Sequence, residues 1–222
     1  MIEVLSVMLD VRLKDIELPF LRGALISKVS NSGTLFHGHL PDGLRYSYPL
    51  IQYKKLGEYA TVVALQEAVP QLAELLLENT VPIKLRLGRR MVSASVSDVF
   101  RQNIDMSVST AMRTFEISRW LPLNQENYDA YCTMDSLADK LAFLENLLLG
   151  NILSFAKGVG VFFEEQVRVS IVYILSTGTF KYKGVEMLGF DIQFRTNVRL
   201  PEFIGLGKGV SLGFGTIMSE DQ

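Results

Sequence analysis

The sequence predicts an α+β fold of two ferredoxin-like (RRM-like) halves in tandem, based on the order βαββαβ, with a glycine-rich loop near the C-terminus. In the first half, apolar residues recur with the periods of a strand, a helix, two strands, a helix and further strand, in that order. The second half follows a variant of the same plan. Hydrophobic residues make up 48% of the 222 residues, which is enough to build a core in each half.

The first half, residues 1–103, opens with an alternation of side chains over 3–13 that predicts a strand with one buried face. After Pro19, apolar residues at every fourth position predict a helix over 21–30. The remaining elements are expected in chain order as β-rich runs over 46–54 and 59–65, a helix over 69–79, and a strand pair or one long bent strand over 83–100.

The second half, residues 104–222, opens with an alternating pattern over 106–117 that predicts a strand. The run over 137–158 predicts a long apolar helix that ends near Gly158 and Gly160, because glycine is a favoured helix stop. The remaining strands are expected over 167–176, 181–198 and 210–218.

Composition excludes several kinds of protein. The formal net charge of −2 lacks the basic excess of most nucleic-acid-binding domains, so an anionic partner must be bound by local charge. One cysteine, Cys132, cannot form an internal disulfide, and with two histidines it cannot complete the usual four-ligand zinc site. We therefore expect no metal and no other cofactor.

The N-terminus and the most hydrophobic run give an expectation about location. Glu3 and Asp10 stand where a secretory signal would be basic and then uniformly apolar. Polar and charged residues interrupt the run over 141–163, which is too broken for a membrane span. We expect a cytoplasmic protein that does not interact with a membrane.

Charge is distributed unevenly along the chain. Residues 81–119 contain seven basic and three acidic side chains, whereas residues 120–166 contain two basic and seven acidic ones. The basic stretch is a candidate phosphate-binding surface. A solvated strand face, balanced by a solvated helix, explains the same pattern.

The two histidines of the chain, His37 and His39, stand together in one loop after the first predicted helix. With an ordinary pKa of about 6.5, histidine is populated in both protonation states near neutral pH and suits general acid–base catalysis. Side chains at i and i+2 of an extended segment also face the same way and can chelate a metal. The residues alone leave catalysis, a metal pair and solvated side chains as three open interpretations.

The segment GLGKGVSLGFG, residues 205–215, holds five glycines and one charge. It is neither a P-loop, which needs GxxxxGK followed by Ser or Thr, nor a dinucleotide fingerprint, since a strand is expected after it. Its glycines can bring backbone N–H groups close to phosphates or simply form a turn between strands. Its spacing resembles the C-terminal glycine-rich loop, GhGxxxxxGhG with h hydrophobic, of the CRISPR-associated RAMP proteins.

Four further stretches extend the resemblance over both halves. They are HGHLPDGLRYSYPLIQYK (37–54), NQENYDAY (124–131), LLLGNILSFAKGVGV (147–161) and FRTNVRLPEFIGLGKG (194–209). Together they resemble the CRISPR repeat-processing endoribonucleases of the RAMP superfamily, in the branch attached to type I-B systems. The resemblance implies metal-free cleavage of precursor CRISPR RNA within each repeat, with the product often retained.

The resemblance also implies roles for residues near the histidine pair. His37 and His39 are then the catalytic acid and base, Lys28 stabilises the charge of the phosphorane, and Tyr46 orients the scissile phosphate or donates a proton. Arg45 is an RNA-binding candidate that can supply the cation instead. Some relatives use a tyrosine on the first helix, where this chain has no tyrosine, and this departure puts the base on a histidine.

The implied partner is CRISPR repeat RNA, with other CRISPR effector subunits or a second copy of the chain as further partners. The RNA-binding candidates are Arg86, Arg89 and Arg90 for the stem backbone, and Lys208 with Gly205, Gly207, Gly213 and Gly215 of the glycine-rich segment. That segment either holds phosphates or keeps the two halves packed. The alternative to the endoribonuclease is a subunit of an effector complex that binds repeat RNA without cutting it.

Overall fold

The computed structural model describes residues 1–28, 48–78 and 82–220. Packing divides the chain into two compact units. The first consists of Met1–Ile104 with Ser211–Gly213, and the second of Asp105–Val210 with Phe214–Gln222. Within the described residues, no helix is long and apolar enough to cross a membrane.

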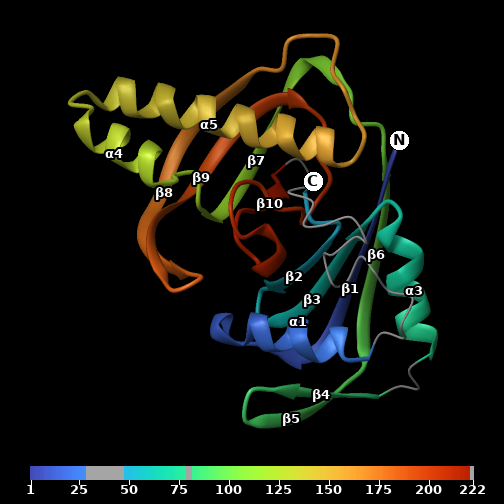
Figure 1. The fold of residues 1–222 in the computed structure, drawn as a ribbon. Helices are drawn as coiled ribbons and strands as arrows, with labels where there is room; N and C mark the ends of the chain where they lie inside the picture. The colour runs from blue at the N-terminus through green and yellow to red at the C-terminus, as the bar shows by residue number, and fades with distance from the viewer. Residues whose placement is uncertain (29–47, 79–81, 221–222) are drawn as a thin grey trace, which may run out of the picture. The chain divides into compact units, whose positions relative to one another are not determined.

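The first unit is an antiparallel sheet with the strand order β2-β3-β1-β6, which is the order of a ferredoxin-like sheet (Figure 1). A separate two-stranded ribbon, β4–β5, precedes the last strand of that sheet. The elements are β1 (Ile2–Arg12), a 3-10 turn (Asp15–Glu17), α1 (Leu18–Ile26), β2 (Ile51–Leu56), β3 (Tyr59–Leu65), α3 (Ala68–Glu78), β4 (Ile83–Leu87), β5 (Arg90–Ala94) and β6 (Val96–Ile104).

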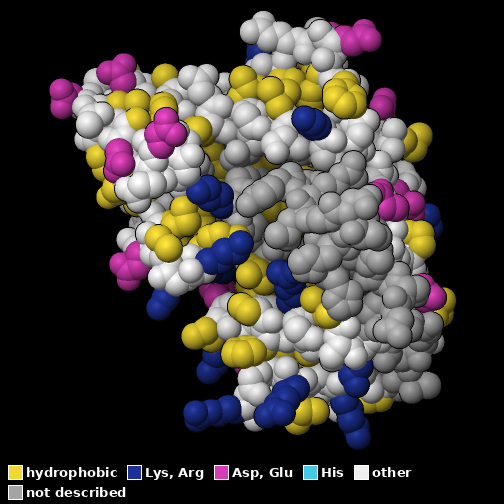
Figure 2. All heavy atoms as spheres, in the orientation of Figure 1, with side chains coloured by type: hydrophobic (Ala, Val, Ile, Leu, Met, Phe, Trp, Pro, Cys, Tyr) yellow, Lys and Arg dark blue, Asp and Glu magenta, His cyan; other side chains and the backbone are white. Residues whose placement is uncertain are grey.

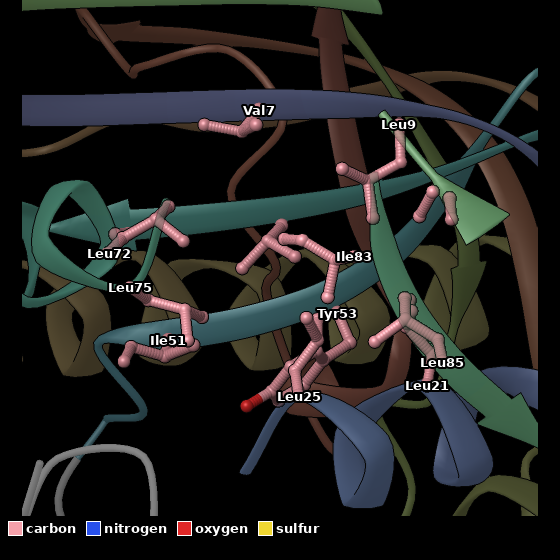
Figure 3. Close-up of a cluster of buried hydrophobic side chains, with 14 of the residues drawn as sticks. Val7, Leu9, Leu21, Leu25, Ile51, Tyr53, Leu72, Leu75, Ile83 and Leu85 are labelled. Atoms are coloured by element: carbon pink, nitrogen blue, oxygen red, sulfur yellow. The ribbon is translucent and has the colours of Figure 1, made fainter. Parts of the chain in front are cut away.

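Helices α1 and α3 cover one face of this sheet, and the hydrophobic core of the unit lies between them and the sheet. The alternation of β1 sends Val7 and Leu9 to the helical side, but Val4 and Ser6 on its other face are buried as well, so the expectation of a single buried face is wrong. On the helical side, Leu21 and Leu25 of α1 meet Tyr53 of β2 (Figure 3). Each large apolar side chain buried in this way contributes about 1.5–3 kcal/mol to folding.

Three elements predicted in the first half have the wrong bounds. The first helix begins at Leu18 rather than 21, because proline is well tolerated in the first helical turn, and it ends at Ile26. The strand expected over 46–54 begins at Ile51. The run over 83–100 forms three strands, because Gly88, at φ 63°, allows a tight turn between β4 and β5 before β6 joins the sheet.

The second unit contains an antiparallel sheet with the strand order β10-β7-β9-β8, which is again the ferredoxin-like order. Helix α5 lies over one face of this sheet (Figure 1), and the predicted α+β class is confirmed. The elements are β7 (Val108–Trp120), α4 (Gln125–Thr133), α5 (Leu137–Gly158), β8 (Val169–Tyr182), β9 (Val185–Val198), a 3-10 turn (Val210–Leu212) and β10 (Thr216–Ser219).

This unit departs from the prediction in three places. The strand expected over 167–176 continues to Tyr182, and the next strand begins at Val185 rather than 181. Between β9 and β10, where the motif has its second helix, the chain runs through the glycine-rich segment, so the strand expected over 210–218 begins at Thr216. Helix α4 was not predicted. The core of the second unit is built on α5, whose Leu144, Leu148 and Phe155 are fully buried, as helical spacing requires.

Candidate functional site

The glycine-rich segment is mostly packed inside the protein. Gly205 forms a β-bridge with Thr216, and the N–H of Leu206 donates to the carbonyl oxygen of Gly215 over 2.8 Å. Gly207 has φ 88°, and a Cβ there would lie 3.0 Å from the indole of Trp120, so a side chain at this position would be strained and tightly packed. The lone charge, Lys208, is exposed, whereas Gly205, Gly213 and Gly215 are buried.

An arginine and three aromatic rings hold the segment in place. The guanidinium of Arg119 lies 4.5 Å from the ring centroid of Phe214 and 5.4 Å from that of Phe180. Tyr182 packs edge-on against Phe214, with 5.7 Å between ring centroids. The backbone N–H of Arg119 donates to a carboxylate oxygen of Asp191 over 2.6 Å. Cation–π pairs contribute about 0.5–2 kcal/mol, depending on their exposure to water, so this cluster helps to fix the backbone beside Lys208.

The arginines predicted to bind a stem lie on and around the β4–β5 ribbon. Arg86 and Arg89 are exposed, and Lys84 joins them. Lys and Arg side chains gather at the bottom of Figure 2, where Figure 1 places the ribbon. The ribbon therefore presents cations to solvent.

Arg90 has a different environment. Its guanidinium binds both carboxylate oxygens of Glu17 over 2.7 and 2.9 Å and donates to the carbonyl oxygen of Arg12 over 2.6 Å. The hydrogen bonding of Arg90 to the carboxylate of Glu17 lowers the pKa of Glu17. Arg90 thus ties the ribbon to the start of α1, and its role toward RNA stays a prediction.

A polar row crosses the first sheet on the face away from the helices. Lys54 on β2 is paired in register with Thr61 on β3, and Ser6 on β1 lies on the same face. All three are buried, and Lys54 is 0% exposed. Burial lowers the pKa of Lys54 to about 7. A lysine in an alternating strand pattern reads as a solvent-facing residue, which is why sequence reasoning passed over it.

Replacing Lys54 by methionine is expected to change the free energy of unfolding by an amount that depends on pH. Between pH 7 and about 10.4 the unfolded chain binds a proton that the folded one lacks, so the penalty for burying Lys54 is greatest at pH 7 or below and fades as pH rises toward 10.4. The free energy of unfolding of Lys54→Met relative to that of the wild type should therefore be higher at pH 7 than at pH 10 by about 2–4 kcal/mol.

Urea unfolding of both proteins at several pH values between 6 and 10 measures this difference. The exposed Lys84 gives the control, since Lys84→Met should change the free energy of unfolding by less than about 0.5 kcal/mol. A stability gain for Lys54→Met that does not vary with pH would show that the charge of Lys54 is not its cause.

The residues predicted around the reaction are placed as follows. His37, His39, Arg45 and Tyr46 lie outside the described residues. Lys28 is exposed two residues beyond the end of α1, and its backbone N–H donates to the carbonyl oxygen of Leu25 over 2.9 Å. Among the described residues, no three acidic, histidine or cysteine side chains are grouped to hold a metal ion.

Comparison with known proteins covers the whole chain. Family models described as the Cas6b N-terminal domain and the Cas6b C-terminal domain match residues 1–105 and 107–220. A crystal structure of Cas6b is 24% identical, with a TM-score of 0.86 over 99% of this chain and 100% of that chain. A CRISPR RNA processing endoribonuclease Cas6b is 23% identical, with a TM-score of 0.72 over 98% and 99% of the two chains.

One relative shares more of its sequence over a shorter length. An uncharacterized protein of Methanocaldococcus jannaschii is 35% identical over 106 residues, which are 48% of this chain and 71% of that protein. The solved structures establish the likeness of the fold, and the two family models together leave out only three residues of the chain.

Proposed function

Because the chain belongs to the Cas6b family, we propose that it is an endoribonuclease that cleaves precursor CRISPR RNA within its repeats. The observation that carries this proposal is the match of both Cas6b domain models in their natural order along the chain. The N-terminal domain, 1–103, then carries the histidine loop, and the C-terminal domain, 104–222, carries the glycine-rich segment.

The proposed reaction needs no metal, because the RNA supplies its own nucleophile. One histidine of the pair His37 and His39 takes the proton of the 2′-OH, and the 2′-oxygen attacks the adjacent phosphorus. The bond from phosphorus to the 5′-oxygen breaks, and the other histidine, as an imidazolium, protonates that oxygen. The products are a 2′,3′-cyclic phosphate and a 5′-OH. The exposure of Lys28 is compatible with a cation that reaches the phosphorane.

RNA binding is assigned to cations that face solvent. Arg86 and Arg89 on the β4–β5 ribbon, with Lys208 in the second unit, are exposed and suit contacts to phosphates. The buried positions of Gly205, Gly213 and Gly215 support a packing role for these glycines, which hold the backbone on both sides of Lys208. Because the net charge is negative, we expect binding through these local cations to weaken steeply with salt.

Incubation of the purified protein with its repeat RNA in EDTA tests the proposal. We expect one cut within the repeat, a cyclic phosphate on the upstream fragment and a free 5′-OH on the downstream one. Tight binding with no product would instead identify a subunit that recognises the repeat without cutting it. Cleavage that appears only when a divalent cation is added would refute the metal-free chemistry.

A further inference from the structure

The second unit contains a pocket of about 690 Å³, and Lys208 is the one residue of its lining that already has a predicted role. A pocket of this size lies within the range that small ligands occupy in proteins. Three segments line it: the start of α4, the tip of the β8–β9 hairpin and the exposed part of the glycine-rich segment. Its lining includes Asn124, Gln125, Tyr128, Tyr182, Lys183 and Lys208.

The two tyrosines give the pocket flat apolar surfaces. Tyr128, on α4, is 42% exposed and so keeps much of its ring accessible. Tyr182 ends β8, and its contact with Phe214 fixes its ring. Val185, 59% exposed, opens β9 next to them in the same lining. Accessible rings backed by a rigid neighbour are suited to stack on a planar ligand.

The cations of the pocket favour an anionic ligand. Lys183, in the hairpin turn, has its ammonium nitrogen 5.5 Å from the ring centroid of Tyr182, and Lys208 reaches the pocket from the glycine-rich segment. Glu186 is the one acidic residue of the lining. Figure 2 shows Lys or Arg side chains beside hydrophobic ones over the tip of this hairpin.

Amide groups at the start of α4 add hydrogen-bonding capacity. Asn124 caps the helix, because its side-chain oxygen accepts a hydrogen bond from the N–H of Asn127 over 2.7 Å. The NH₂ group of the same side chain is a donor that this cap does not use. Gln125 donates to Asp129 over 2.9 Å, which leaves its oxygen as an acceptor. An amide donor and an amide acceptor can pair with the polar edge of a nucleobase.

We propose that this pocket binds one unpaired nucleotide of the RNA, with its base against Tyr128 and Tyr182 and its phosphates near Lys183 and Lys208. The proposal rests on the proposed function for its ligand and adds a site for single-stranded RNA. A paired base presents no free face inside a stem, whereas an unpaired base can be turned out and stacked on an aromatic ring. Rings, cations and amides lie together here in the way that such a base requires.

The test is the affinity for repeat RNA made uncleavable by 2′-deoxy substitution, measured by fluorescence anisotropy. Tyr128→Ala should weaken binding about tenfold, since stacking of one base on an aromatic ring changes affinity by about 5- to 150-fold. Tyr128→Phe keeps the ring and should bind within about twofold of the wild type. Tyr173→Ala is the matched control, because Tyr173 is an exposed tyrosine of β8 outside the pocket.

Abasic substitutions identify the bound nucleotide. At one unpaired position, removal of the base should weaken wild-type binding at least as much as Tyr128→Ala does, and Tyr128→Ala should then weaken the binding of that abasic RNA no further. Equal affinities for wild type and Tyr128→Ala, or additive effects at every position, would overturn the proposal.

These measurements use RNA that cannot be cut, so they are independent of cleavage. If the wild-type protein never cleaves repeat RNA and Tyr128→Ala binds the RNA more weakly than the wild type does, the endoribonuclease is refuted and the pocket is supported. If the wild type cleaves the RNA and Tyr128→Ala binds it with unchanged affinity, the endoribonuclease is supported and the pocket is refuted.

Discussion

Replacing both His37 and His39 by alanine is expected to abolish cleavage of repeat RNA. Each positioned acid or base contributes about 10²–10⁴-fold to the rate, and loss of the pair removes both proton transfers of the proposed reaction. The single variants His37→Ala and His39→Ala should each be slowed by at least about 100-fold. Single-turnover rates with excess protein measure this effect separately from product release.

Two controls separate chemistry from folding and binding. The double variant should unfold at the same urea concentration as the wild type and bind uncleavable repeat RNA within about threefold of it. Added imidazole should restore part of the rate of a single variant, because a small base can then enter in place of the lost side chain. Undiminished cleavage by the double variant would refute the assignment of acid and base to this loop.

Gly215→Ala is expected to lower the free energy of unfolding by more than about 4 kcal/mol, which is an unusually large effect for one methyl group. Gly215 has φ 63°, and a Cβ there would overlap the carbonyl oxygen of Leu206. The neighbour cannot easily move away, because the N–H of Leu206 donates to the carbonyl oxygen of Gly215. The added methyl group must therefore break this pairing and displace the backbone.

Gly160 provides the control for backbone strain alone. It has φ 77° but no atom within 4 Å of a Cβ, so Gly160→Ala should lower stability by only about 1–2 kcal/mol. Urea denaturation of the three proteins measures both effects. Equal losses of stability in the two variants would show that the close approach of Leu206 does not matter.

The fold was largely predictable, because the spacing of apolar residues within a long segment identifies it as a helix or a strand. The helix expected over 137–158 and the strand expected over 59–65 have the predicted bounds. Helix α4 was missed because its sequence is polar and none of its residues is buried, so it has no apolar period to detect. The loop that replaces the second helix of the C-terminal half was visible in its glycines, but the short length of β10 was not.

Individual site residues were less predictable, because their roles depend on distant partners. Arg86, Arg89 and Arg90 look alike in sequence, yet Arg90 alone pairs with Glu17, 73 positions away. Similarly, Tyr128 and Tyr182 come from opposite ends of the α4–β8 stretch and share a pocket only after folding. Spacing identified the family, whereas tertiary contacts decide which of these cations remain exposed to solvent.

Metal-independent cleavage by attack of the 2′-OH is the central claim, and one substituted RNA tests it most directly. The repeat is synthesised with a single 2′-deoxynucleotide immediately upstream of the scissile phosphate and incubated with the protein in EDTA. We expect this RNA to bind with unchanged affinity and to remain intact, while the all-ribose RNA is cut to completion. Cleavage of the deoxy-substituted RNA at the same phosphate would contradict the mechanism, because its nucleophile would then come from outside the RNA.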